Sequence, residues 1–143
     1  MKIFLATSFS SQIGANGGII PSYKKFVEDI INALRAKGHE VFCAAEYEGW
    51  RYFHATAKVG VRKDLEEIDK SDAVVALLHE KISGGIHTEI GYAVGLGKKV
   101  ILATQNLELR YFNQGMVDNN RAQSIQFKDP AELADKATEF LKE

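Results

Sequence analysis

Residues 73–78 read Ala-Val-Val-Ala-Leu-Leu, an uninterrupted apolar run with the length of one β-strand. A strand that is apolar on both sides has to be covered on both sides, which is typical of a parallel sheet between two layers of helices. Apolar segments at residues 3–6, 41–44 and 100–103, and a weaker one at 124–127, predict four more strands. The pattern therefore favours an α/β fold.

Helical signals lie between these segments. Apolar residues recur at helical spacing over residues 23–34, directly after Ser22, which predicts a helix capped by that serine. We expect a second helix that ends near Lys70, a third over roughly residues 88–96, and a last one that opens at Asp129-Pro130. The first three predicted helices thus each connect one predicted strand to the next, and the last follows the fifth strand.

This alternation predicts a single flavodoxin-like (Rossmann-like) domain over residues 1–143. Its doubly wound sheet has five parallel strands in the order 2-1-3-4-5, with helices on both faces. Residues 45–56 show no regular pattern and are rich in aromatic side chains. Ligands of such sheets bind at the carboxyl ends of strands 1 and 3, so residues 7–21 and 79–87 are the predicted binding loops.

The composition restricts the partners of this chain. A net charge of −1 gives no general attraction to nucleic acid polymers or to anionic membranes. No apolar run approaches the roughly 20 residues of a membrane span. Cys43, the single cysteine, lies in an apolar stretch, which predicts a buried free thiol and a reducing cytoplasm. We expect a soluble cytoplasmic protein that acts on a small molecule.

The predicted loop before the third helix carries the sequence Ser83-Gly84-Gly85. Glycines at a helix N-terminus form an anion site, because free amides point outward and phosphate can approach the backbone. Glycine-rich turns also occur for packing reasons, so local chemistry alone leaves both interpretations open. His87 follows in the same segment and is either a loop or capping residue or a substrate contact.

Two carboxylates complete this set of candidates. Glu89 is predicted in the first turn of the third helix, where the helix dipole would keep it ionised, as a carboxylate nucleophile must be. The dipole equally favours a glutamate without any catalytic role there. Asp64 lies three residues after Val61 and four before Ile68, on the inward face of the second helix. An inward carboxylate is costly unless it is used or paired, here with a neighbouring basic residue.

Two carboxylates beside an anion-binding loop suit the cleavage of an N-glycosidic bond. One carboxylate attacks the anomeric carbon, and the second group assists departure of the base. His79 and His87 lack the spacing of a zinc-binding helix, and a single cysteine also argues against zinc. We therefore expect neither a metal nor an organic cofactor.

Residues 83–100 resemble the signature of the nucleoside 2-deoxyribosyltransferase-like proteins, which is a glutamate followed by Ile/Leu-Gly and then Gly-Lys before the next strand. Segments 3–9, 62–68 and 71–76 agree in order and spacing, so the resemblance covers about residues 2–104. It implies a flavodoxin-like fold and a covalent glycosyl-enzyme intermediate. Glu89 occupies the position of the nucleophile, and Asp64 that of the aspartate near the leaving base.

The resemblance also indicates a branch of that family. The transferases that act on unphosphorylated nucleosides typically have aspartate six residues before the nucleophile, whereas this chain has Ser83, as in the hydrolases of nucleoside 5′-monophosphates. Aspartate would repel a phosphate dianion, while serine can donate a hydrogen bond to it. Ser8 falls where that branch has another phosphate-contacting serine, and Phe9 where an aromatic or bulky residue faces the nucleobase or sugar.

Within that branch the chain looks most similar to the cytidylate hydrolases of nucleoside-antibiotic pathways, with two departures. Those hydrolases have an arginine where this chain has Ser10. The deoxynucleotide N-hydrolases have a tyrosine where this chain has Phe4. Both the preferred base and the preferred sugar therefore stay open.

The leading hypothesis is hydrolysis of a nucleoside 5′-monophosphate. The alternatives are a nucleoside 2-deoxyribosyltransferase and a non-catalytic nucleotide-binding or sensing module, since a fold does not fix a function. The resemblance further implies a homodimer with its sites at the subunit interface. Tyr111 and Phe112, together with the small residues Gly91, Ala93 and Gly95, would suit close packing there.

Overall fold

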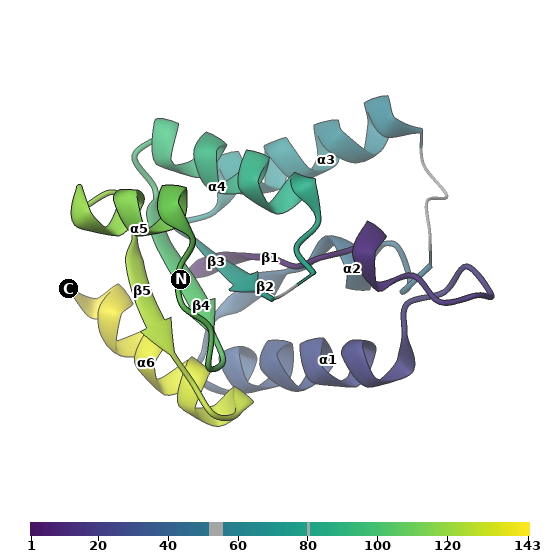
Figure 1. Cartoon of the computed structure of the whole chain (residues 1–143), viewed down its shortest axis with the longest axis horizontal. Helices are drawn as coiled ribbons and strands as arrows, with labels where there is room; N and C mark the ends of the chain where they lie inside the picture. Colours follow the sequence, from purple (N-terminus) through teal and green to yellow (C-terminus); the bar gives the residue numbers. More distant parts are fainter. Residues whose placement is uncertain (52–55, 80) are drawn as a thin grey trace.

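The computed structural model describes residues 1–51, 56–79 and 81–143. Its centre is one sheet of five strands, all of them paired in parallel, in the order β2-β1-β3-β4-β5 (Figure 1). The predicted fold class is therefore confirmed. The strands are β1 (Lys2–Ala6), β2 (Glu40–Phe42), β3 (Ala73–Leu78), β4 (Lys99–Thr104) and β5 (Gln123–Gln126).

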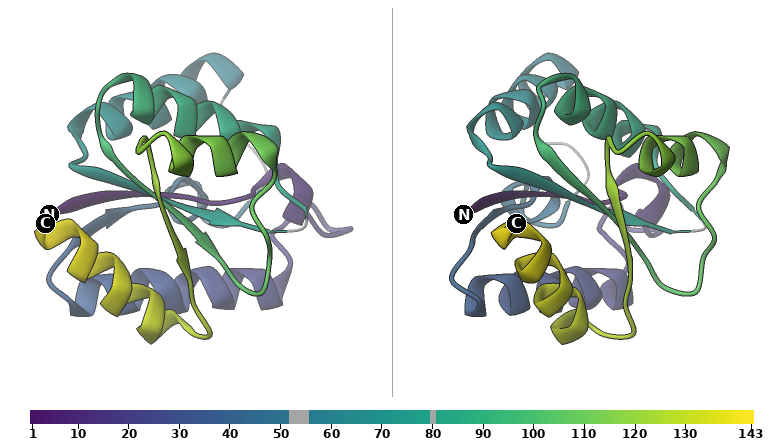
Figure 2. Two further views of the ribbon diagram at one scale, coloured as in Figure 1. Left: turned by 60° about the vertical axis from the view of Figure 1, so that its left-hand side comes forward. Right: turned by 90° about the vertical axis from the view of Figure 1, so that its left-hand side faces the viewer.

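Helices cover both faces of this sheet. Figure 2 shows α1 and α6 on one face and α3, α4 and α5 on the other. The short α2 follows β2 near the carboxyl end of the sheet. The helices are α1 (Pro21–Ala36), α2 (Ala44–Tyr47), α3 (Ala57–Lys70), α4 (Gly84–Gly95), α5 (Tyr111–Asp118) and α6 (Pro130–Lys142).

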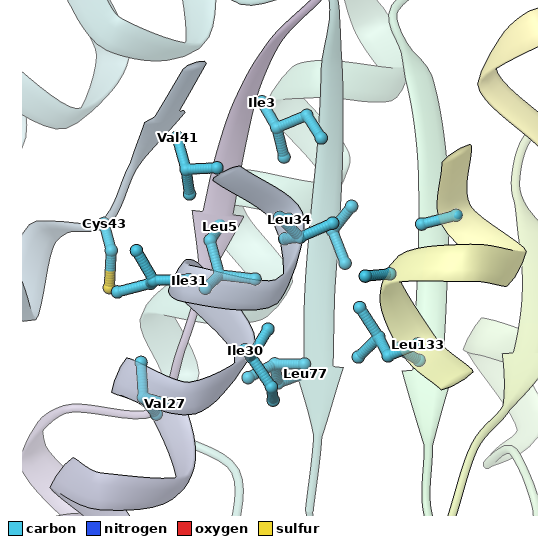
Figure 3. Close-up of a cluster of buried hydrophobic side chains, with 14 of the residues drawn as sticks. Ile3, Leu5, Val27, Ile30, Ile31, Leu34, Val41, Cys43, Leu77 and Leu133 are labelled. Atoms are coloured by element: carbon cyan, nitrogen blue, oxygen red, sulfur yellow. The ribbon is translucent and has the colours of Figure 1, made fainter. Parts of the chain in front are cut away.

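The sheet separates two apolar clusters, and β3 contributes to both. Its side chains alternate, with Val75 and Leu77 in the cluster beneath α1 and α6, and Val74 and Ala76 in the cluster beneath α3 and α4. Every residue of β3 is buried, as an apolar strand between two helical layers should be. Figure 3 shows the cluster beneath α1, which includes the buried free thiol of Cys43, as predicted.

Two local expectations were wrong. The first helix begins at Pro21 with Ile20 at its N-cap, and Ser22 is not a cap. Proline at the first helical position has the backbone angle that a helix requires, and its missing N–H would have no helical partner there. Residues 44–47 form α2 inside a stretch expected to be irregular, and the part of that stretch at 52–55 lies outside the described residues.

No helix in the described part of the chain is both long enough and apolar enough to cross a bilayer.

Candidate active site

The topology opens a crevice between β1 and β3. These strands are neighbours in the sheet, but the chain leaves β1 toward α1 on one face and leaves β3 toward α4 on the other. Such a switch point separates the two connecting loops and leaves room for a ligand. A pocket of about 350 Å³ lies there, lined by Thr7, Phe9, Ser10, Ala44, Glu48, Ala57, Gly60, Val61, Asp64, Leu65, Ser83, Gly85, Ile86, Thr88 and Glu89.

The pocket brings together most of the residues that the sequence singled out. Both predicted carboxylates, Glu89 and Asp64, line it, and so do Phe9, Ser83 and Gly85. Segments from opposite halves of the chain therefore meet in one place, as the alternating pattern predicted.

The other predicted residues lie around the pocket. Ser8 is buried directly behind it, where its Oγ accepts a hydrogen bond of 3.2 Å from the backbone N–H of Ser83. Gly84 and His87 are exposed on α4 and are not among the residues that line the pocket. Substrate contact by these two residues stays a prediction.

The helix that carries Glu89 begins earlier than expected. Ser83 is the N-cap of α4, and the N–H of Ile86 donates to the carbonyl oxygen of Ser83 (3.2 Å), so Gly84 and Gly85 form its first turn. Glu89 is therefore in the second turn and not the first. Because the helix dipole acts mainly within the first turn, it does not determine the charge of Glu89.

Burial determines the charge of this carboxyl group instead. Loss of contact with water raises the pKa of Glu89 to about 8, and the negative charge of Asp64 adds to the effect. Burial likewise raises the pKa of Asp64 to about 6, followed by the charge of Glu48, while Lys63 acts in the opposite direction. The Glu89–Asp64 pair therefore holds about one proton near neutral pH.

Asp64 points into the pocket without an ionic partner from the described residues. Lys63, its neighbour on α3, donates to Glu67 at 2.8 Å and lies 4.8 Å from the ring centroid of Tyr47, so its charge is engaged elsewhere. The alternative in which a basic neighbour neutralises Asp64 is thus not supported. Val61 lines the pocket but is 56% exposed, so the buried face of α3 is narrower than the spacing predicted.

A cluster of serines closes the end of the pocket near β1. The Oγ of Ser83 accepts hydrogen bonds from the backbone N–H groups of Phe9 (3.1 Å) and Ser11 (3.2 Å). It also accepts from the Oγ of Ser10 (3.3 Å) and donates to that of Ser11 (3.1 Å). Three donors thus converge on the Ser83 hydroxyl at this end of the pocket.

Ser10 and Ser11 were not expected to contribute to this cluster. Their signal in the sequence is the repetition of serine at positions 8, 10 and 11 directly after the first strand.

A second cavity, of about 530 Å³, opens on the α1 side of the sheet. It is lined by residues of α1, β3, β4 and the loop after β4, including Tyr23, Phe26 and His79. None of its described lining residues is a carboxylate, so it lacks the groups that N-glycoside cleavage requires. The smaller pocket with Glu89 and Asp64 is therefore the candidate active site.

Comparison with known proteins identifies the family. Residues 16–124 match the profile of the nucleoside 2-deoxyribosyltransferase family, a range that contains Asp64, Ser83 and Glu89. The match also extends past residue 104, where the resemblance ended. No curated protein sequence matches the chain.

Solved structures of similar fold span almost the whole chain. The CMP N-glycosidase BcmB of Clostridium botulinum is 25% identical, with a TM-score of 0.70 over 96% of this chain and 98% of that chain. A 2-deoxyribosyltransferase of Bacillus psychrosaccharolyticus is 22% identical, with a TM-score of 0.69 over 94% of this chain and 90% of that chain. BlsM is 24% identical, with a TM-score of 0.73 over 94% of this chain and 85% of that chain.

A parallel sheet with two carboxylates and a serine cluster at its switch point fits an enzyme that acts on N-glycosidic bonds. The chain belongs to the nucleoside 2-deoxyribosyltransferase family, and it is an N-glycosidase or a 2-deoxyribosyltransferase.

Proposed function

We propose that this enzyme hydrolyses the N-glycosidic bond of a nucleoside 5′-monophosphate and releases the free base and a 5-phosphosugar. The observation that carries the proposal is the combination, in one pocket, of the Glu89 carboxylate with the converging donors around Ser83. The 25% identity to a structure described as a CMP N-glycosidase also supports it.

The proposed reaction has two steps and uses the two carboxylates in turn. The ionised carboxylate of Glu89 attacks the anomeric carbon, and the bond between this carbon and the base nitrogen breaks. The base takes the bonding electron pair and a proton from Asp64. A water molecule then gives its proton to Asp64 and attacks the anomeric carbon, which frees Glu89. No metal or organic cofactor takes part in these steps.

The 5′-phosphate would lie at the serine cluster. Ser83, the amide of Gly85 and the neighbouring serines offer donors on one side of the pocket, while Glu89 lies deeper on the same helix. Gly84 and Ser8 complete this proposed contact set behind and beside Ser83. Phe9, which also lines the pocket, would pack against the sugar or the base.

The second candidate is transfer of the sugar to another base, the activity that gives the family its name. A panel of ribo- and deoxyribonucleoside 5′-monophosphates, assayed for free base, tests hydrolysis. Adding a second free base then tests transfer, since a transferase would form the new nucleotide and a hydrolase would not. Base release from no nucleotide on the panel would contradict the proposed function.

The pH dependence of hydrolysis should be bell-shaped with a maximum near neutrality. The pKa of Asp64 lies at about 6 and that of Glu89 at about 8. Below the lower value both groups are protonated and Glu89 cannot attack, and above the higher value neither group can protonate the base. Between the two values the pair shares one proton, and the reactive form is the fraction of enzyme in which that proton sits on Asp64 and Glu89 is ionised. The measurement is kcat/KM for the preferred nucleotide between about pH 5 and about pH 9.

The variant Asp64→Asn tests which carboxyl group causes the fall in kcat/KM on the acid side and on the alkaline side of the maximum. The substitution leaves Glu89 as the single titrating carboxyl of the pair, so only an acid limb should remain. This limb should move to lower pH, because loss of the repelling charge of Asp64 lowers the pKa of Glu89. Glu66→Gln, on the exposed side of the same helix, should leave the bell unchanged. A profile that stays flat across the range in the unmodified enzyme would argue against a shared proton.

We also propose that the protein forms a homodimer. We expect it to be located in the cytoplasm. Tyr111 and Phe112 at the start of α5 are 95% and 69% exposed, and Gly91 and Gly95 are exposed on the neighbouring α4. Aromatic residues and close helix packing are common at such interfaces. Ala93, in contrast, is buried in the core beneath α4, so its expected place in an interface was wrong.

The test is the mass in solution at micromolar concentration, by light scattering. We expect a dimer that becomes monomeric when Tyr111 and Phe112 are both changed to serine, because two large apolar groups leave the interface. Ile20→Ser, which removes an exposed apolar side chain before α1, is the matched control and should stay dimeric. A monomer in the unmodified protein would contradict the proposal.

A further inference from the structure

The carboxylates of the described residues fall into two groups. Those that are partly or fully buried are almost all held by hydrogen bonds or ion pairs, such as Glu67 with Lys2 (2.8 Å). Within the described part of the chain, three partly buried carboxylates make neither, and all three line the pocket described above. They are Glu48, Asp64 and Glu89. The reaction proposed above gives a role to the last two only.

Glu48 is placed in the pocket by the end of α2. It is the C-cap of that helix, and its backbone N–H donates to the carbonyl oxygen of Ala44 at 2.9 Å. Glu46 on the same helix is instead paired with Arg35, with bonds of 2.6 and 3.0 Å. A carboxylate left without a partner beside another unpartnered one costs free energy, which a ligand could relieve.

The position of Glu48 along the pocket indicates what part of a ligand it would meet. The serine cluster lies at one end, Glu89 follows on α4, and the remaining wall is formed by α2 and α3 with Ala44, Glu48 and Asp64. With the 5′-phosphate at the serines and the anomeric carbon at Glu89, the base extends toward the wall of α2 and α3.

The three carboxylates are not arranged as a metal site. Among the residues that the structure describes, no group of three or more His, Cys, Asp or Glu side chains could hold a metal ion.

We propose that Glu48 selects nucleotides whose base carries an exocyclic amino group, an inference that rests on the proposed function. An ionised carboxylate only accepts hydrogen bonds, so it pairs with an amino group and repels a carbonyl oxygen at the same position. In this proposal Asp64 donates a proton to the leaving nitrogen, and Glu48 accepts a hydrogen bond from the amino group at the edge of the base. The substrate class is a cytosine-like or adenine-like 5′-monophosphate rather than its oxo counterpart.

The experiment compares two matched pairs of substrates, the 5′-monophosphates of cytosine and uracil and those of adenine and hypoxanthine. In the unmodified enzyme kcat/KM should favour the amino member of at least one pair by about tenfold or more, the size of one good carboxylate contact to a base. Glu48→Gln should bring that ratio close to one, because an amide both donates and accepts. Glu46→Gln, which changes a carboxylate already paired with Arg35, is the matched control and should keep the ratio.

A second readout separates this inference from the proposed reaction. Calorimetric binding of the same four nucleotides to Glu89→Gln, and to Glu89→Gln combined with Glu48→Gln, requires no turnover. Tighter binding of the amino members that disappears in the Glu48→Gln variant supports the inference, whether or not the enzyme releases free base. Absence of base release would refute the proposed hydrolysis but not the role of Glu48. Preference for the oxo members, a ratio unchanged by Glu48→Gln, an equal change in Glu46→Gln, or no binding of any of the four would overturn it.

Discussion

Glu89→Gln should lower the turnover of the preferred nucleoside 5′-monophosphate by about a thousandfold or more, a loss of roughly 4 kcal/mol of transition-state stabilisation. Glutamine keeps the size of the side chain and removes the carboxylate that, in the proposed mechanism, attacks the anomeric carbon. The measurement is single-turnover release of free base. Normal hydrolysis by this variant would remove Glu89 from the mechanism.

The same substitution should stabilise the fold. The pKa of Glu89 is about 8 in the folded enzyme against an ordinary value of 4.5, so ionisation of this group opposes folding once the pH exceeds the ordinary value. Glutamine removes that cost. We expect the free energy of unfolding at pH 8 to rise by about 1–3 kcal/mol, a gain that disappears as the pH falls toward about 4.5.

Denaturant unfolding of both proteins at acidic and alkaline pH measures this difference. Glu66→Gln, on the exposed side of α3, is the control and should change neither activity nor stability. Loss of activity together with a loss of stability in Glu89→Gln would indicate a damaged fold rather than a missing nucleophile.

We expect kcat/KM for the preferred nucleoside 5′-monophosphate to exceed kcat/KM for the matching nucleoside by about a hundredfold or more. Charge-assisted hydrogen bonds contribute roughly 1.5–3 kcal/mol each, and the start of a helix adds about 0.3–1 kcal/mol, or up to ~2 when partly buried. Two such bonds at the serine cluster suffice for this preference. Equal rates on nucleoside and nucleotide would show that the 5′-phosphate is not recognised, and would favour the transferase.

Ser83→Asp tests the same contact from the side of the protein. Aspartate is a good N-cap, and its carboxylate can accept the N–H groups of Phe9 and Ser11 that now bond to the Ser83 hydroxyl, so the loop should keep its shape. The added negative charge repels phosphate. We expect kcat/KM of the variant to fall for the nucleotide and to stay unchanged for the nucleoside, so that the ratio of the two values decreases. Ser124→Asp, at an exposed position of β5, should leave the ratio unchanged.

The sequence predicts the sheet better than it predicts the site. The apolar run at residues 73–78 requires cover on both faces, and strand order follows from the alternation of elements. The charge state of Glu89 could not be predicted in the same way. The start of α4 at Gly84 could not be read from the sequence, because two consecutive glycines are as typical of a loop as of a first helical turn.

Glu48 illustrates the other limit of prediction from sequence. It follows a helix of only four residues in a stretch without hydrophobic periodicity, so no local pattern indicates which way its side chain points. Its neighbours in the pocket come from α3 and α4, and only the packing of these helices on the sheet brings them together. Residues that gain their meaning from tertiary contacts leave little trace in a single sequence.

The three unpartnered carboxylates also affect the stability of the transition state relative to that of the bound substrate. Cleavage of an N-glycosidic bond passes through an oxocarbenium-like state, in which the sugar ring gains positive charge. A cavity with a surplus of negative charge favours that state over the neutral ring of the bound substrate. At the proposed phosphate site, the serines would hold the phosphate dianion away from the carboxylates. The pocket is thus complementary to a charge that exists only while the bond is breaking.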